Sequence, residues 1–183
     1  MGNTIREIRN TNFLMKDSLK EFSECLDKTL EGRLYAIPGR NALVYLFTNA
    51  GFFIVLENNK SLIHKTIDAT PLRKYQFREV TVNNMTAYLC KPEDDKDKVI
   101  NYDACFNWEN MYVLSGKIIV SKETGWYNVV DVYDVRNNFK YKYSYSIPVK
   151  LPDNYAYSIN VNGDYLYLYL NKEGLKRYKI TIP

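Results

Sequence analysis

Residues 156–170 read AYSINVNGDYLYLYL, and this stretch decides the fold class. Along Tyr165–Leu170 leucine alternates with tyrosine, a period of two that is typical of a β-strand with one buried face. Asn162-Gly163 separates this run from a second alternating run, Ala156–Val161. An Asn-Gly pair between alternating runs is the strongest short-range signal for a β-hairpin. The stretch therefore predicts an antiparallel hairpin, which a third strand at Leu175–Ile182 continues.

The same pattern extends toward the N-terminus, with Gly and Asn-Asn turns between the runs. Strands are predicted at Arg33–Ile37, Ala42–Phe47, Phe52–Glu57, Leu62–Ile67, Tyr75–Val82, Thr86–Cys90, Val99–Phe106, Met111–Leu114, Ile118–Ser121, Val129–Val135 and Tyr141–Ile147. Short meandering strands in series are typical of a sandwich, a barrel or a propeller. A weak internal repeat over 41–67, 110–147 and 162–182 favours the propeller. We therefore expect an all-β fold, a partial β-propeller of antiparallel four-stranded blades.

The N-terminal region has a different, helical pattern. Between Asp17 and Leu30 the apolar residues recur at helical spacing, and Ser18 with Glu21 forms a capping box. One short amphipathic helix is predicted there. The expected organisation is a helical segment over 1–32 and a β-propeller-like domain over 33–183.

Composition and charge exclude several classes of protein. Of the 183 residues, 46% are apolar and 25% charged, which is enough for an ordinary core, and 17 are tyrosine. The net charge is only +4 and the basic residues do not cluster, so no nucleic-acid partner is expected. No apolar run approaches the ~18 residues of a membrane span. Because the first residues lack an apolar segment, we also expect no signal peptide in the chain as given.

The three cysteines are far apart in the chain. An odd number without a Cys-x-x-Cys pair cannot form a complete disulfide framework, and zinc-ligand spacing is missing. Buried thiols are the simpler interpretation, and a Cys90–Cys105 bridge is the alternative. No cofactor is expected.

Three stretches together carry a family resemblance. They are Ala42–Leu56 running into Ile63–Pro71, then Val129–Val135 followed by Tyr143–Pro148, and finally Gly163–Ile180. In this order and spacing the chain resembles bacterial six-bladed β-propeller proteins of the NHL and TolB type. The resemblance covers about Leu30 to Ile182 and implies the C-terminal half of such a protein, two to three blades.

The resemblance also implies a function and a location. It implies a non-catalytic interaction module of the periplasm or cell envelope. Because an open half-propeller exposes the faces and edges of its end blades, we expect a protein partner or self-association. Some six-bladed propellers are metal-dependent lactonases, and the loose candidates for that chemistry are Asp68, Asp103 and Asn107.

Few titratable groups suggest a reactive site. Asp131 and Asp134 are three residues apart on a strand, so they point to opposite faces and are expected to solvate a turn and an edge. Asp68, with Thr66 and Thr70, either lines a channel mouth or ties down the loop before Pro71.

Catalysis and metal binding have little support. His64 is the only histidine and has no recognisable nucleophile, so no catalytic residue is assigned. The acidic run Glu93–Asp97 lacks the order of an EF-hand, so no metal site is assigned.

Alternating tyrosines provide the main candidate for binding. They occur at Tyr141, Tyr143 and Tyr145, at Tyr155 and Tyr157, and at Tyr165, Tyr167 and Tyr169. Such a face either fills the space between packed sheets or binds carbohydrate or a peptide strand. The candidate binding residues are Tyr143, Tyr145, Tyr165, Tyr167 and Asp68.

Overall fold

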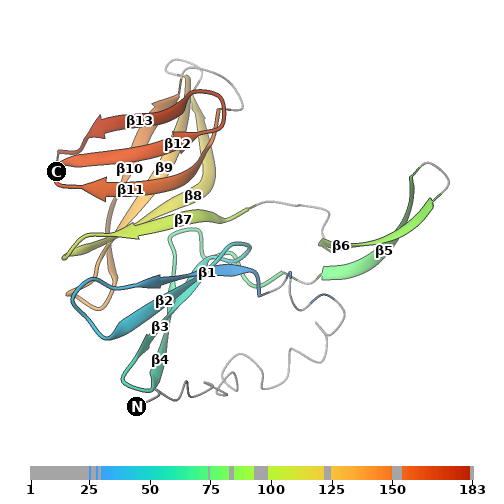
Figure 1. Ribbon diagram of the computed structural model, residues 1–183, viewed down its shortest axis with the longest axis horizontal. Helices are drawn as coiled ribbons and strands as arrows, with labels where there is room; N and C mark the ends of the chain where they lie inside the picture. The colour runs from blue at the N-terminus through green and yellow to red at the C-terminus, as the bar shows by residue number, and fades with distance from the viewer. Residues whose placement is uncertain are drawn as a thin grey trace, which may run out of the picture. The chain divides into compact units, whose positions relative to one another are not determined.

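The computed structural model describes residues 30–73, 75–82, 85–92, 99–121, 125–149 and 154–181, together with Cys25 and Lys28. Its elements are thirteen β-strands, β1 to β13, in antiparallel pairs (Figure 1). This confirms the predicted all-β class. No helix among the described residues is long and apolar enough to cross a membrane.

The chain divides into two compact units. One comprises residues 1–30 and 73–97, and the other comprises residues 31–72 and 98–183. The helix predicted over Asp17–Leu30 lies outside the described residues except for Cys25, Lys28 and Leu30.

The larger unit holds three antiparallel meanders, in each of which every strand pairs with the next one along the chain. The first is β1 (Gly32–Ala36), β2 (Ala42–Phe47), β3 (Phe52–Glu57) and β4 (Lys60–Lys65). The second is β7 (Asn101–Phe106), β8 (Asn110–Ser121), β9 (Gly125–Asp134) and β10 (Lys140–Val149). The third is β11 (Ala156–Asn162), β12 (Tyr165–Leu170) and β13 (Gly174–Lys179).

Two of the predicted turns have the backbone geometry that short hairpins require. Asn58 and Asn59 join β3 to β4 with φ of 50° and 62°, and positive φ at both central residues is the mark of a type I′ turn. Gly163, with φ of 55°, begins the two-residue loop between β11 and β12. A residue with a side chain would be strained at that position.

The strands predicted separately at Met111–Leu114 and Ile118–Ser121 form one strand, β8, whose register shifts between Leu114 and Ile118. Gly116 lies at this irregularity, and its N–H donates to the carbonyl of Ile100 at 2.7 Å, so the backbone stays hydrogen-bonded where the two predicted strands join. A Cβ at this position would collide with the backbone of Val99, so only glycine lets the two segments approach.

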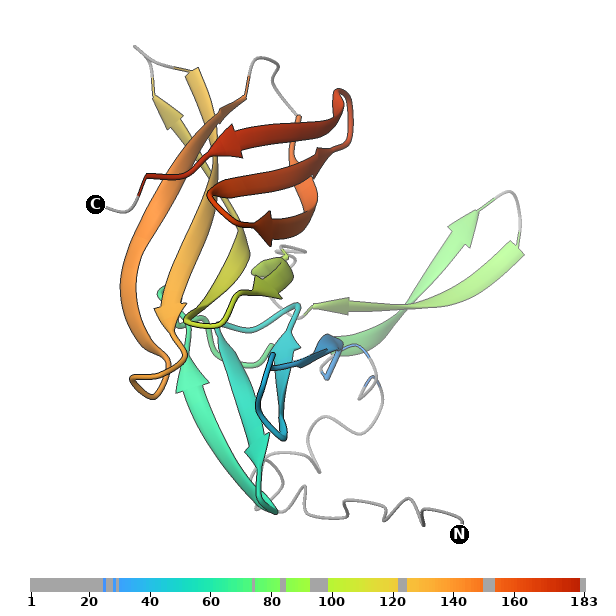
Figure 2. The ribbon, with the colours of Figure 1, turned by 60° about the vertical axis from the view of Figure 1, so that its left-hand side comes forward.

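The middle sheet, β7–β10, is covered on both faces. One hydrophobic cluster joins it to the β1–β4 sheet, and a second joins it to the β11–β13 sheet. Figure 2 shows the β11–β13 sheet beside β8, β9 and β10. Among the largest fully buried side chains are Phe53 and Tyr133 in the first cluster and Leu114, Leu166 and Leu168 in the second. Each buried side chain of this size stabilises the fold by about 1.5–3 kcal/mol.

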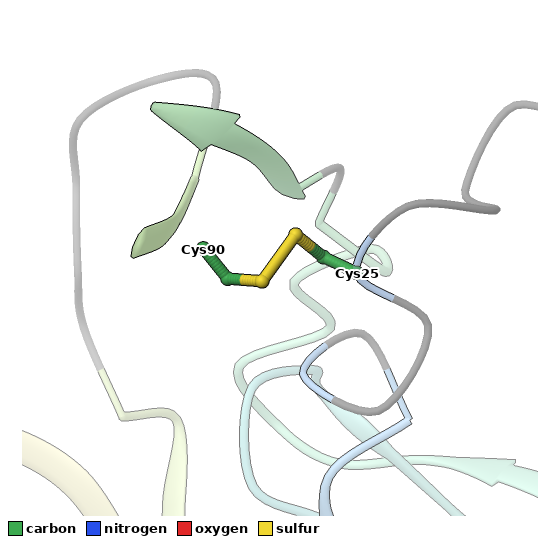
Figure 3. The surroundings of a disulfide bond; sticks show 2 residues. All are labelled: Cys25 and Cys90. Atoms are coloured by element: carbon green, nitrogen blue, oxygen red, sulfur yellow. A yellow bond between two sulfur atoms is a disulfide. The ribbon is translucent and has the colours of Figure 1, made fainter. Parts of the chain in front are cut away.

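The smaller unit contains a two-stranded hairpin, β5 (Tyr75–Val82) and β6 (Met85–Pro92). A disulfide joins Cys90 of β6 to Cys25, with 6.0 Å between their Cα atoms (Figure 3). The expectation of buried thiols is therefore wrong for Cys25 and Cys90, and the Cys90–Cys105 alternative is wrong too, because Cys90 bonds Cys25. Cys105 lies in β7 of the larger unit as a free thiol whose pKa burial raises strongly, so it is not poised to react. The acidic run Glu93–Asp97 lies outside the described residues.

Candidate functional site

Strand β12 separates leucines from tyrosines. Its three leucines are buried in the core that the β11–β13 sheet shares with the middle sheet, whereas its three tyrosines point to the opposite side. Tyr165 and Tyr167 are half-buried, and Tyr169 keeps 45% of its surface exposed. The side chains that give this side its character are Tyr157, Tyr165, Tyr167, Tyr169, Arg177 and Lys179, and we refer to them as the outer tyrosine face.

The register of the sheet places a cation opposite each of two tyrosines. Lys179 pairs with Tyr165, and Arg177 pairs with Tyr167. Directly opposite residues on one face have Cβ atoms about 4.5–5.5 Å apart, so each of these pairs is adjacent on the same side of the sheet. On the other flank, Asn162 pairs with Tyr165 and Asn160 with Tyr167. Aromatic, cationic and amide groups therefore form adjacent columns.

The rings of this face contact one another and Arg177. The guanidinium carbon of Arg177 lies 4.7 Å from the centroid of the Tyr165 ring, a cation–π contact. The Tyr157 ring packs edge-to-face against Tyr169 with centroids 5.0 Å apart. Leu175, opposite Tyr169, is 64% exposed and extends the apolar surface.

A hollow of about 650 Å³ lies at the rim of the same sheet. Lys176, Arg177 and Tyr178 of β13 line one wall, and Pro148 and Val149 of β10 line another. Arg177 therefore belongs both to the outer tyrosine face and to the lining of this hollow.

Tyr143 and Tyr145, the other two tyrosines predicted to bind, have different surroundings. Both are half-buried and pack against the core between the middle sheet and the β11–β13 sheet. Their rings meet edge-to-face at 5.2 Å, and burial is the main cause that raises the pKa of Tyr145. The sequence pattern predicts the same role for all four tyrosines, whereas the structure places only Tyr165 and Tyr167 on the outer tyrosine face.

A second cluster surrounds Asp103, where the first strands of the three meanders meet. The hydroxyl of Tyr35 in β1 donates to Asp103 Oδ1 at 2.7 Å, and an Arg33 guanidinium nitrogen lies 3.2 Å from the same oxygen. Ser158 Oγ and the Ile159 N–H of β11 donate to Oδ2 at 2.8 and 3.0 Å. Both carboxylate oxygens are thus used to join β1, β7 and β11.

Burial, reinforced by the Asp103 carboxylate, raises the pKa of the Tyr35 phenol well above its usual range. The phenol therefore stays protonated as a hydrogen-bond donor. The sequence patterns do not single out Tyr35, Arg33 or Ser158. No local signal could have found them, because they are far from Asp103 in the chain. Tyr35 is 68 residues away from Asp103, and Ser158 is 55 residues away.

The carboxylates of Asp134 and Asp131 accept hydrogen bonds from nearby groups of the fold. Asp134 Oδ1 accepts the N–H groups of Arg136 and Asn137, so Asp134 closes a turn as expected. The same expectation is wrong for Asp131, which is buried rather than solvated at an edge and accepts a hydrogen bond from Ser144 Oγ at 2.5 Å. Burial is the main cause that raises the pKa of Asp131.

Asp68 also serves its own loop. Its Oδ1 accepts a hydrogen bond from Thr70 Oγ1, and the Thr66 carbonyl accepts from the Ala69 N–H. This is the loop-tying arrangement that the sequence analysis gave as one of two alternatives for Asp68.

His64 and Asn107 have structural contacts as well. The imidazole of His64 stacks on Phe53 at 5.2 Å, and burial lowers its pKa, which favours the neutral ring. Asn107 Oδ1 accepts the N–H groups of Glu109 and Asn110 in the turn before β8. Among the described residues, no three His, Cys, Asp or Glu side chains are grouped so that they could hold a metal ion.

Comparison with known proteins adds no family to this description. No protein-family model matches the chain, and no curated protein matches it.

Proposed function

We propose that this protein is a non-catalytic binding module whose ligand contacts the outer tyrosine face. One observation carries the proposal: the sheet already buries a complete row of leucines on its inner side, while the tyrosines on the outer side keep part of their surface exposed beside Arg177 and Lys179. Tyrosine combines a large apolar surface with a hydroxyl and is enriched where proteins bind partners. The alternative of a metal-dependent hydrolase is not proposed, because Asp103 and Asn107 already bond within the fold.

We further propose that the three meanders are blades of a partial propeller. Two have four antiparallel strands, as a blade does, and successive sheets pack face to face. The hydrogen bonds at Asp103 bring together β1, β7 and β11, the first strand of each meander. In a propeller, the first strand of each blade would lie nearest the axis. The resemblance to six-bladed NHL and TolB-type proteins supports the same interpretation.

Screening arrays of glycans and peptides against the full chain, with Tyr167→Ala as the comparison, tests the binding proposal. We expect at least one class of ligand to bind the wild-type chain and to lose binding to the variant. Tyr88→Ala is a matched control, because this β6 tyrosine is 66% exposed and belongs to the smaller unit. Equal binding by wild type and Tyr167→Ala would overturn the proposal.

Self-association is a second candidate, favoured by the outer side of the β1–β4 sheet. Leu34 and Ile63 are 56% and 50% exposed at the two ends of a row across the sheet, whose middle members are the half-buried Tyr45 and the buried Ile54. Three blades are half of a six-bladed ring, so a second copy is the partner of matching geometry. Analytical ultracentrifugation should show a dimer that Ile63→Lys dissociates, and a monomer at all concentrations would contradict this candidate.

We also propose that the protein works in an oxidising compartment such as the bacterial cell envelope. The Cys25–Cys90 disulfide gives weak support, because disulfides persist mainly outside the reducing cytosol. Mass-spectrometric mapping of these cysteines in protein taken directly from cells would test it, and two free thiols would contradict it.

A further inference from the structure

We infer that the outer tyrosine face binds an extended glycan that carries carboxylate groups, an inference that rests on the proposed binding function. Three properties of the face lead to this ligand class: its shape, its hydrogen-bonding groups and its charge.

The shape of the face suits an extended chain. Tyr165, Tyr167 and Tyr169 follow one strand, and alternate residues on a strand are about 6.6–6.8 Å apart. The rings therefore form a row rather than the walls of a cavity. A linear oligomer laid along β12 could contact each ring in turn, whereas a small compact ligand could contact only one or two.

The hydrogen-bonding groups suit a ligand rich in hydroxyls. Asn160 and Asn162 flank the tyrosines, and a side-chain amide offers both donors and an acceptor. Asn160 Oδ1 accepts from the Val161 N–H at 2.8 Å, which fixes the orientation of its amide. Sugar rings have apolar faces that pack on aromatic side chains and hydroxyls that need both donors and acceptors.

The charge of the face selects an acidic glycan. Arg177 and Lys179 stand opposite two of the tyrosines, and a guanidinium binds a carboxylate with two parallel hydrogen bonds. Among the described residues of β11–β13 and their connecting turns, the acidic groups are at the turns: Asp164 is exposed, and Glu173 is held by Asn154 Nδ2 at 2.6 Å and Lys176 Nζ at 3.6 Å. The middle of the face is therefore cationic.

A single-stranded nucleic acid fits this surface less well. Proteins that bind such strands combine stacking rings with a positively charged groove that follows the phosphates. Here Leu175, an exposed apolar residue, stands opposite Tyr169 where a third cation would be needed. The sparse cations and the paired amides favour a polymer with fewer charges and more hydroxyls.

Isothermal titration calorimetry with the full chain tests this inference. The probes are a galacturonate hexamer, maltohexaose as its neutral counterpart, a single-stranded dT oligonucleotide and poly-glutamate. We expect the galacturonate hexamer to bind most tightly and its affinity to fall as salt is added. Tyr167→Ala and Arg177→Gln should each weaken binding about tenfold or more, whereas Tyr167→Phe should keep most of the affinity because it retains the ring.

Arg136→Gln provides the matched control, since Arg136 is an exposed arginine that pairs with Glu109 away from this face. Tighter binding of maltohexaose, the oligonucleotide or poly-glutamate, lost in Tyr167→Ala, would overturn the glycan inference and leave the binding function standing. If no probe binds, or if Tyr167→Ala binds the hexamer as the wild type does, the inference falls. In that case the array comparison of Tyr167→Ala decides separately whether the binding function stands.

Discussion

The two sides of β12 share one backbone but have different surroundings. On the inner side Leu166, Leu168 and Leu170 are fully buried against the middle sheet, while on the outer side three tyrosines stand beside two cations. Burial of apolar area is the main stabilising force of folding, so the inner side supplies stability. The tyrosines of the outer side bury less apolar area than the leucines, and they leave a surface that can contact a ligand. From this comparison we expect the fold of this sheet to depend more on its leucines than on its tyrosines.

The largest expected effect is on the inner side. Leu168→Ala should lower the free energy of unfolding by about 4 kcal/mol, because it removes a fully buried side chain and leaves a cavity. Urea denaturation would measure the change. Leu175→Ala is the control on the exposed side, where we expect a change of less than about 0.5 kcal/mol. Equal effects of the two substitutions would break the distinction between the sides.

The second largest effect is expected at Asp103, whose carboxylate joins three strands by hydrogen bonds as the leucines join two sheets by apolar contact. Asp103→Ala should cost about 3 kcal/mol, because it leaves the Tyr35 hydroxyl, the Ser158 hydroxyl and the Ile159 N–H without their acceptor. Asp103→Asn keeps one carbonyl oxygen and should cost less. Guanidinium denaturation of both variants would measure this order. Unchanged stability of Asp103→Ala would show that the junction of β1, β7 and β11 does not depend on the carboxylate.

Tyr143 and Tyr167 extend the comparison to side chains of the same type. Tyr143→Ala should destabilise the fold by about 2 kcal/mol, since the ring packs on the core, and Tyr167→Ala by about 1 kcal/mol or less, since its half-buried ring lies outside the core clusters. Thermal unfolding of the two variants in parallel would show the difference. A larger loss at Tyr167 than at Tyr143 would identify the outer tyrosine face as part of the core.

The smallest effect is expected at Asp131 and depends on pH. Because burial raises the folded-state pKa of Asp131 above its unfolded value of about 3.9, ionising this carboxylate weakens the fold. Its contribution to stability is complete below the unfolded pKa and is lost as pH rises through the folded pKa.

Asp131→Asn, whose carbonyl can still accept from Ser144, should therefore be slightly more stable than the wild type at pH 7. Unfolding curves at pH 7 and near pH 4 would show this advantage shrinking toward the lower pH. A variant that is less stable at pH 7, with the difference closing in acid, would mean that the fold stabilises the ionised carboxylate.

The strands of this protein could be predicted because local patterns encode them. The period of two along Tyr165–Leu170 and the Asn162-Gly163 turn define their hairpin with nothing from the rest of the chain. The roles of the tyrosines could not be predicted in this way. Tyr143 and Tyr167 alternate in the same manner, and only the sheets packed around them decide which ring meets the core.

The contacts between residues far apart in the chain could not be predicted from the sequence either. Tyr35 meets Asp103 across 68 residues, and Cys25 bonds Cys90 across 65. The pairing of Arg177 with Tyr167 depends on the register of β12 and β13, which the strand pattern alone does not define.

A nuclear magnetic resonance titration with the galacturonate hexamer tests most directly the claim that the outer tyrosine face is a binding surface. We expect the backbone amide resonances that shift to belong to Tyr165–Leu170 and Gly174–Lys179, and those of residues around Asp103 to remain unchanged. Shifts that centre on Asp103 and Tyr35, or that leave β12 and β13 untouched, would contradict it.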